Sequence, residues 1–186
     1  MIVGQEKYLL RTSLDRELYK MSDIIRYNGR LVIKTENLAE HSYYVAMNIY
    51  KLAQMFNIEE TIVNKAIKIA LCHDLGEIFT GDLPHSIKAY SPEINSISKQ
   101  LEIDIMKEQF PYFAEDFERY ITQKESLLTV LVEAADCLDV LAYVDREEQL
   151  GNKSDEIVQI KAESSERYIK LIEKLKKLIE KEKQNE

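Results

Sequence analysis

Four residues in the sequence have side chains that could together bind one divalent metal ion. They are His41, the adjacent pair His73 and Asp74, and Asp136. Two imidazoles and two carboxylates suit a transition metal such as Mn, Co, Ni, Cu or Zn, and the residue types do not choose among these. A bound ion of this kind lowers the pKa of a water molecule, which supplies a nucleophile at neutral pH. The set therefore points to hydrolysis.

Each of these residues alone also has an ordinary explanation. His41 could be a hydrogen-bonded core or cap histidine. The His73-Asp74 dipeptide can occur by chance. Asp136 could form an ion pair with a lysine or an arginine. The case for a site depends on their joint placement and on the sequence around them.

The elements that must position the four ligands are predicted to be helices. Apolar residues recur with a period near 3.6, and only five Gly and three Pro interrupt the chain. His41 begins the second predicted helix, and His73 and Asp74 lie on the third, where Asp74 continues the apolar face. Asp136 lies at the edge of the apolar stripe of a dense, central helix from Leu127 to Tyr143. The predicted apolar stripes are Leu10, Leu14, Leu18, Met21 and Ile25; Val45, Ile49, Leu52 and Phe56; Val63, Ala66, Ile67 and Ala70; Ile94, Ile97, Leu101 and Ile105; and Ile160, Tyr168, Leu171, Leu175 and Leu178.

Three further boundaries are predicted from the punctuation of the chain. Pro111 interrupts the fourth stripe, and a short helix follows from Glu115 to Ile121. Asp155 is the expected N-cap of an amphipathic C-terminal helix over about residues 155–183. With no repeat in the sequence, we expect residues 1–186 to form a single all-α domain, a compact helical bundle.

Composition excludes several classes of partner. The chain has 186 residues, of which 45% are hydrophobic and 31% charged, which is typical of a globular protein. A net charge of −8 without a basic stripe argues against binding to a nucleic-acid polymer. Because the sequence shows neither a spanning apolar run nor a signal peptide, we expect no membrane partner and a cytoplasmic location. Cys72 and Cys137 are then expected to be buried, reduced thiols rather than ligands or a disulfide.

Three segments around the candidate ligands resemble a known family. They are TENLAEHS from Thr35 to Ser42, HDLGEIFTGDLP from His73 to Pro84, and EAAD from Glu133 to Asp136. Together they resemble the HD-domain metal-dependent phosphohydrolases, and most closely the bacterial 5'-deoxynucleotidase branch. The spaced H…HD…D pattern is shared by many HD proteins, whereas the longer strings are more specific. The resemblance covers about residues 26–152.

The resemblance implies roles for particular residues. The metal ligands of the family fall on His41, His73, Asp74 and Asp136. Its acidic residues after the HD pair fall on Glu77 and Asp82, which are expected to be catalytic. Its substrate-binding residues fall on Arg26 and Tyr27 ahead of the first histidine, and on Thr80 within TGDLP. Relatives carry Trp at the position of Tyr27, a difference that bears on discrimination between deoxyribose and ribose. The family fold is a helical bundle, commonly a homodimer.

The function expected from these observations is hydrolysis of (deoxy)nucleoside 5'-monophosphates to nucleoside and phosphate. Glu77 is four residues after His73, so its carboxylate would face the same cavity if the helix continues, where it could orient water or pass a proton. The alternative for Glu77 is a solvated acid in the last turn of the helix.

Three other functions stay open at this point. The first is another HD-type chemistry, a triphosphohydrolase or a phosphodiesterase acting on a small nucleotide; a guanosine-tetraphosphate hydrolase would need an acid where Ile78 follows Glu77. The second is a non-catalytic module that a metal ion merely stabilises, although structural sites are usually closed and often rich in thiolates. The third is a scaffold built on the C-terminal helix, which would leave the inner acidic motifs unexplained.

Overall fold

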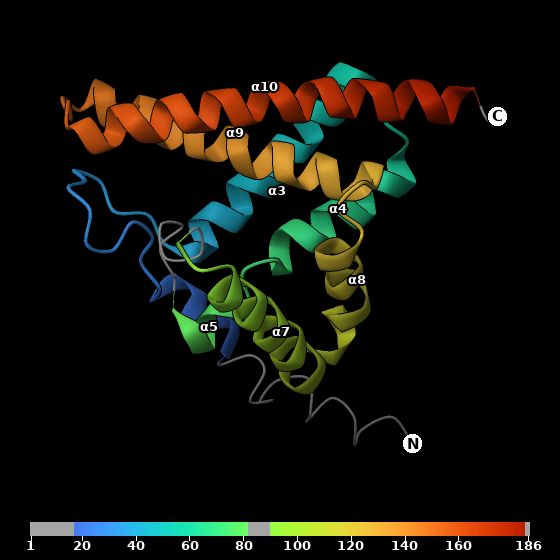
Figure 1. Cartoon of the computed structure of the whole chain (residues 1–186), viewed down its shortest axis with the longest axis horizontal. Coiled ribbons are helices and arrows are strands. Elements are labelled where there is room, and N and C mark those ends of the chain that lie inside the picture. Colours follow the sequence, from blue (N-terminus) through green and yellow to red (C-terminus); the bar gives the residue numbers. More distant parts are fainter. Residues whose placement is uncertain (1–16, 82–89, 185–186) are drawn as a thin grey trace, which may run out of the picture.

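The computed structural model describes residues 17–81 and 90–184, and these ranges are helical apart from turns and one isolated antiparallel bridge. Figure 1 shows a layer of long helices above a smaller group. The elements in chain order are the 3-10 helix η1 (Lys20–Ser22) and the α-helices α3 (Leu38–Phe56), α4 (Glu60–Cys72), α5 (Glu77–Thr80), α7 (Pro92–Gln109), α8 (Pro111–Thr122), α9 (Leu127–Gln149) and α10 (Asp155–Lys183). The predicted all-α fold is confirmed.

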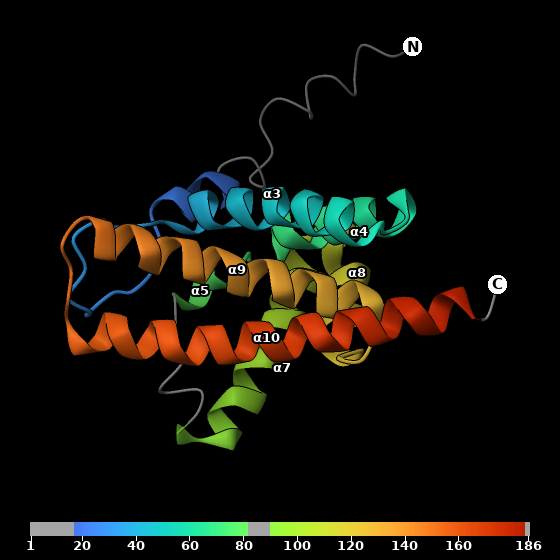
Figure 2. The same cartoon turned by 90° about the horizontal axis from the view of Figure 1, so that it is seen from above.

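The larger hydrophobic core lies between α3, α4, α9 and α10. The predicted stripe of α3 is confirmed, since Val45, Ile49 and Leu52 are fully buried. α10 runs back alongside α9, and both views show the two helices side by side (Figures 1 and 2). Because α9 has neighbours on opposite sides, even the consecutive residues Val130, Leu131 and Val132 are all buried. This explains the density of apolar residues that marked the helix as central.

A second, smaller core joins α7 and α8 to the region around η1 and the end of α4. Its largest fully buried side chains include Phe110, Phe117 and Met106. Ile121 packs against both cores, so the two are continuous through α8.

The predicted apolar stripe of α7 is wrong for three of its four residues. Ile94, Ile97 and Leu101 are 42%, 68% and 45% exposed, whereas Ser98 is buried and donates a hydrogen bond to Glu102. The start of α7 extends away from the layer of long helices, as Figure 2 shows. Its apolar residues therefore have no long helix to pack against, which the helical period of the sequence did not reveal.

Two other predicted boundaries need correction. α8 begins at Pro111 and not at Glu115. Proline is favourable at the first position of a helix, so Pro111 starts α8 instead of lying before it. The N-cap residue of α10 is Ser154, and Asp155 lies in the first turn, where its charge is favourable at the positive end of the helix dipole.

The first predicted stripe also needs correction. Leu10 and Leu14 lie outside the described residues. The helical turns end at Ser22, and Ile25 instead forms the isolated bridge with Asn37 and is 40% exposed. Backbone hydrogen bonds from Arg26 N to Glu36 O and from Leu38 N to Ile24 O hold this crossing, so the chain there is extended rather than helical.

The segment between η1 and α3 is anchored on the end of α9. The buried carboxylate of Glu147 accepts hydrogen bonds from the backbone N–H groups of Ile33 and Lys34, each at 2.7 Å, and from Asn152 Nδ2 at 2.6 Å. The hydroxyl of Tyr143 donates to Lys34 O. The anchor fixes the backbone that carries Arg26 and Tyr27.

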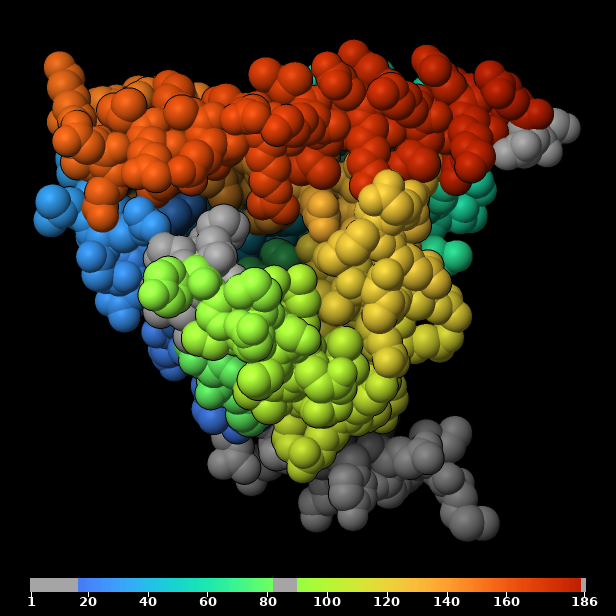
Figure 3. All heavy atoms as spheres, in the orientation of Figure 1, coloured from blue at the N-terminus to red at the C-terminus, as the bar shows by residue number. Residues whose placement is uncertain are grey.

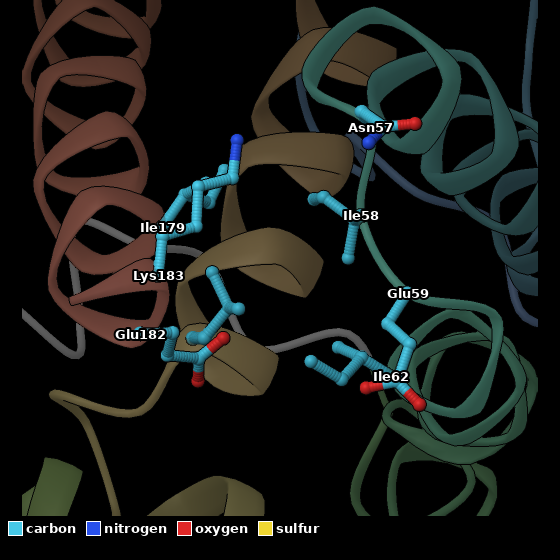
Figure 4. A pocket seen from close by; sticks show the side chains of 8 residues that line it. Asn57, Ile58, Glu59, Ile62, Ile179, Glu182 and Lys183 are labelled. Atoms are coloured by element: carbon cyan, nitrogen blue, oxygen red, sulfur yellow. The ribbon is translucent and has the colours of Figure 1, made fainter. Parts of the chain in front are cut away.

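A cavity of about 330 Å³ lies at the far end of α10 (Figure 4). Ile179 and Lys183 of α10 face Ile58 and Ile62 of the α3–α4 region across it. None of the four predicted metal ligands lines this cavity. In the part of the chain that the structure describes, no helix has the length and apolar character needed to cross a membrane.

Candidate metal centre

The predicted ligands gather where α3, the turn after α4 and α9 meet. One ligand atom from each of His41, His73 and Asp74 lies within 4.8 Å of the other two. Asp74 Oδ2 is 3.5 Å from His41 Nε2 and 3.3 Å from His73 Nε2. Asp136 Oδ1 is 3.3 Å from His41 Nε2. The Nε2 atoms of both imidazoles therefore face the same oxygen of Asp74, and Asp136 approaches from the side of His41.

His41 is positioned by the start of α3. The side chain of Asn37 accepts a hydrogen bond from Glu40 N, and the Glu40 carboxylate accepts one from Asn37 N, which together form a capping box. This box fixes the first turn of the helix. His41 follows it directly and is 1% exposed.

The expectation that His73 and Asp74 lie within the third helix is wrong by one to two residues, because both follow directly after its end. α4 ends at Cys72, and the next residues form a tight turn in which Leu75 N donates to Cys72 O and Glu77 N to Asp74 O. α5 then begins at Glu77. α7 packs closely against this turn, since a Cβ added to Gly76 would lie 3.1 Å from Glu102 Cγ. Glycine at position 76 therefore allows α7 to approach the turn closely.

The second ring nitrogen of each histidine is held by a hydrogen-bond acceptor. His73 Nδ1 lies 2.8 Å from the carbonyl oxygen of Ala70, and His41 Nδ1 lies 2.7 Å from Asp139 Oδ2. An Nδ1–H that donates to such a partner leaves Nε2 with its lone pair directed at a metal, which is the usual outer arrangement of metal-binding histidines. The donor set therefore fits one divalent ion bound through the two Nε2 atoms and carboxylate oxygens.

The charges around His41 also favour a cation. Burial and the positive charge of Arg26 lower the pKa of His41, but hydrogen bonds and charges from Asp136, Asp139 and Asp74 outweigh them and raise it to about 9. Burial raises the pKa of Asp136, but the hydrogen bond and charge of His41 outweigh it and hold the pKa well below its usual range. The Asp136 carboxylate thus stays ionised beside His41, which favours a cation at this position.

The two thiols are buried and free, as predicted. Burial raises the pKa of Cys72 to about 12 and that of Cys137 to about 11, and Cys137 Sγ donates to the Ser164 carbonyl oxygen. Among the described residues, neither cysteine belongs to a group of side chains that could together hold a metal ion. The ligand set consequently contains nitrogen and oxygen atoms only.

Arg26, predicted to bind substrate, lies on the Nδ1 side of His41. Its Nη1 atom is 2.7 Å from Glu36 Oε2 and 3.6 Å from Asp139 Oδ2, and the three residues form what we call the buried charge cluster. Nη1 is also 2.6 Å from His41 Nδ1. One nitrogen cannot both donate to Asp139 and accept from Arg26, and the tautomer that binds a metal through Nε2 is the one that donates. Arg26 then has Glu36 and Asp139 as acceptors.

The structure describes three of the four remaining predicted residues, Tyr27, Glu77 and Thr80. Tyr27 has a left-handed backbone conformation with φ of 59°, and its ring stacks on Tyr143 with centroids 4.4 Å apart. Glu77 is 9% exposed, which does not fit the alternative of a solvated acid. The hydroxyl of Thr80 donates to Gly81 O at 3.2 Å. Asp82 lies outside the described residues.

Three residues near the centre were not predicted from the sequence. Asp139 and Glu36 belong to the buried charge cluster, and Arg167 of α10 places Nη1 3.7 Å from Asp136 Oδ2. Asp139 follows Asp136 by three residues, so its position on the same side of α9 could have been predicted from the helical period. Arg167 is distant in the sequence, and only the packing of α10 on α9 reveals it.

Comparison with known proteins shows what the chain is similar to. The model of a family described as 5'-deoxynucleotidase YfbR-like matches residues 15–180. A 5'-deoxynucleotidase of Yersinia pestis (strain Pestoides F) is 33% identical over 145 residues, 70% of each chain. A conserved hypothetical protein from Pyrococcus furiosus is 32% identical, with a TM-score of 0.64 over 83% of this chain and 97% of that one. The cyanophage S-2L HD phosphohydrolase DatZ, solved with dA and one catalytic Zn²⁺ ion, is 20% identical with a TM-score of 0.69 over 95% of this chain and 100% of that one, a likeness in fold.

Proposed function

Because the chain belongs to the YfbR-like 5'-deoxynucleotidase family, and is therefore a nucleotide phosphohydrolase, we propose that its substrates are (deoxy)nucleoside 5'-monophosphates. The observation that carries this proposal is the pair of histidines, His41 and His73, whose Nδ1 atoms are held and whose Nε2 atoms face Asp74. This arrangement serves a metal-dependent hydrolase and has no evident purpose in a scaffold.

His41, His73, Asp74 and Asp136 would hold the divalent ion. When bound, the ion lowers the pKa of a water molecule and polarises a phosphate oxygen. Nitrogen and oxygen ligands are compatible with Mn, Co, Ni, Cu and Zn, and DatZ was solved with Zn²⁺. The choice among these ions is not fixed by the nitrogen and oxygen ligands.

The residues of the chain then act on water and substrate. The oxygen of one water molecule attacks phosphorus, the bond from phosphorus to the 5' oxygen breaks, and the water proton is passed on until the nucleoside leaves as an alcohol. Glu77, buried directly after the ligand turn, is our candidate for orienting the water and accepting its proton. Asp82 would assist from the segment that follows.

Substrate recognition by Arg26, Tyr27 and Thr80 remains a prediction. Arg26 is buried with its charge paired to Glu36 and Asp139, so it holds the carboxylate that accepts the Nδ1 proton of His41. A direct contact with the phosphate would need part of this network to open. Tyr27 is held by its stacking on Tyr143, so a fixed ring could restrict the sugar. A preference for deoxyribose is proposed on this ground.

Assembly and location are also proposed. One face of α3 exposes Tyr43, Met47 and Tyr50, which are 56%, 49% and 50% accessible and lie one above the other on the helix. An exposed apolar stripe of this kind supports a homodimer, for which sedimentation at several protein concentrations is the test.

The continuity of the two cores through Ile121 supports one domain. The two buried, unlinked thiols fit the predicted cytoplasmic location.

The proposed function is tested by chromatographic identification of the products formed from a panel of ribo- and deoxynucleoside monophosphates, triphosphates and cyclic nucleotides, with each of several divalent metals. We expect turnover of the monophosphates. Glu77→Gln should lower kcat by about 10²- to 10⁴-fold, the usual contribution of a general base, with bound metal and thermal unfolding unchanged. Turnover of triphosphates or cyclic nucleotides alone would assign the chain to another branch of HD chemistry, and full activity in Glu77→Gln would remove Glu77 from the mechanism.

A further inference from the structure

Arg167 places a positive charge beside the candidate metal centre from α10. Its Nη1 atom lies 3.7 Å from Asp136 Oδ2, while the other oxygen of the same carboxylate faces His41 Nε2. The Arg167 side chain is 52% exposed. Among the residues that the structure describes, it is the one lysine or arginine with an ion pair to a carboxylate of the proposed ligand set.

The backbone that carries Arg167 is fixed on α9. Ser164, one helical turn earlier on the same face of α10, accepts the hydrogen bond of Cys137, the residue next to Asp136. One turn beyond Arg167, Leu171 is buried in the large core. The backbone of Arg167 is therefore held at a fixed position relative to Asp136.

Other nearby cations are engaged more tightly. Arg26 has a 14% exposed side chain and a 2.7 Å contact with Glu36. Lys124 pairs with Glu133 at 3.1 Å and lies over the ring of Tyr120. Arg167 has one long contact, so most of its five N–H donors are available to a ligand.

The surface around this point is open. Figure 3 shows a hollow beneath α10, bordered by α8 and α7, with atoms of the α3–α4 part of the chain at its floor. The carboxylates of Asp74 and Asp136 are each 20% exposed, so the centre is accessible. A phosphate monoester that enters carries about two negative charges and needs donors beyond the metal ion in a chain of net charge −8.

We infer that Arg167 binds the phosphate group of the substrate, with its guanidinium donating to phosphate oxygens at the mouth of the site. This inference rests on the proposed function. Because the contact is to phosphate and not to the nucleoside, Arg167 determines the affinity for the phosphate-bearing substrate and for the phosphate product. The residue thus makes the C-terminal helix a part of the active site.

The test compares Arg167→Gln, Arg167→Lys and a matched surface control, Arg119→Gln, whose residue is 55% exposed and pairs with Glu115 on α8. The measurements are KM for a deoxynucleoside monophosphate, inhibition by inorganic phosphate, inhibition by the deoxynucleoside, bound metal and thermal unfolding. Arg167→Gln should raise both KM and the inhibition constant of phosphate by about 10- to 100-fold. Inhibition by the deoxynucleoside and the metal content should not change, Arg167→Lys should recover part of the loss, and Arg119→Gln should match the wild type.

Two results would overturn the inference. The first is an unchanged inhibition constant for phosphate in Arg167→Gln. The second is a loss of bound metal in that variant, since Arg167 would then act by holding Asp136. If the wild-type protein hydrolyses none of the nucleotides, the proposed function fails instead, and that outcome is separate because it appears without any substitution.

Discussion

The two sides of His41 differ in how completely their charges are paired. On the Nδ1 side, Arg26, Glu36 and Asp139 have side chains that are 14%, 9% and 5% exposed, and contacts as short as 2.7 Å join them. On the Nε2 side, Asp74, Asp136 and Arg167 are 20%, 20% and 52% exposed, with contacts of 3.3 to 3.7 Å. The first group satisfies its charges internally, whereas the second is available to a ligand. One imidazole thus connects a positioning cluster to a reaction site.

The largest stability effect is expected in the buried charge cluster. Arg26→Gln leaves the carboxylates of Glu36 and Asp139 without their cation, and breaking a buried pair in this way costs about 3 to 5 kcal/mol. Denaturant unfolding of the metal-free protein measures the effect. Arg167→Gln is the matched control on the exposed side, and its expected change is within about 0.5 kcal/mol, as for other surface ion pairs. Equal losses of unfolding free energy in the two variants would contradict the proposed difference between the two sides of His41.

A smaller effect, on metal affinity, is expected at the junction between the two sides. Asp139→Asn replaces the acceptor of the His41 Nδ1 proton by an amide, which holds the imidazole less well in its metal-binding tautomer. Loss of such an outer partner typically weakens metal binding about 10- to 100-fold. Calorimetric titration with Co²⁺ measures this. An unchanged affinity would show that Asp139 only neutralises Arg26.

The smallest effect concerns Glu147, another buried acid of α9, which belongs to neither group of side chains around His41. Burial raises its pKa, but hydrogen bonds from Ile33, Asn152 and Lys34 outweigh burial and lower the pKa below its ordinary value of 4.5. A lowered folded-state pKa stabilises the protein above the unfolded-state pKa, and this contribution is lost as pH falls through the folded-state value. Glu147→Gln should therefore cost about 1 kcal/mol at neutral pH, and the cost should shrink in unfolding measured below about pH 4.5. A cost independent of pH would mean that the charge of Glu147 contributes nothing.

Features of the site that depend on residue type or on a local pattern could be predicted from the sequence, whereas features that depend on contacts between distant segments could not. His41, His73, Asp74 and Asp136 were identified by residue type, and the apolar periods of α3 and α9 placed them on helices that do meet. The end of α4 at Cys72 was missed by one to two residues because an apolar period does not mark the residue at which a helix ends.

The two sides of His41 could not be separated from the sequence. Arg26 was assigned to the substrate by resemblance, but its pairing with Glu36 and Asp139 depends on how the segment before α3 crosses α9. The sequence around Arg167 gave no indication of a role at the site, since a charged residue on an amphipathic helix ordinarily faces solvent. Its place beside Asp136 follows from the packing of α10 along α9.

The central claim is that the Nε2 side of His41 holds the metal ion and the Nδ1 side does not. Two groups of side chains in the described residues could bind an ion, His41 with His73 and Asp74, and His41 with Glu36 and Asp139. Anomalous diffraction from crystals loaded with Co²⁺ or Zn²⁺ distinguishes them directly. We predict one peak bonded to Nε2 of both His41 and His73 and to carboxylate oxygens of Asp74 and Asp136. A peak among Glu36, His41 Nδ1 and Asp139 would contradict the account.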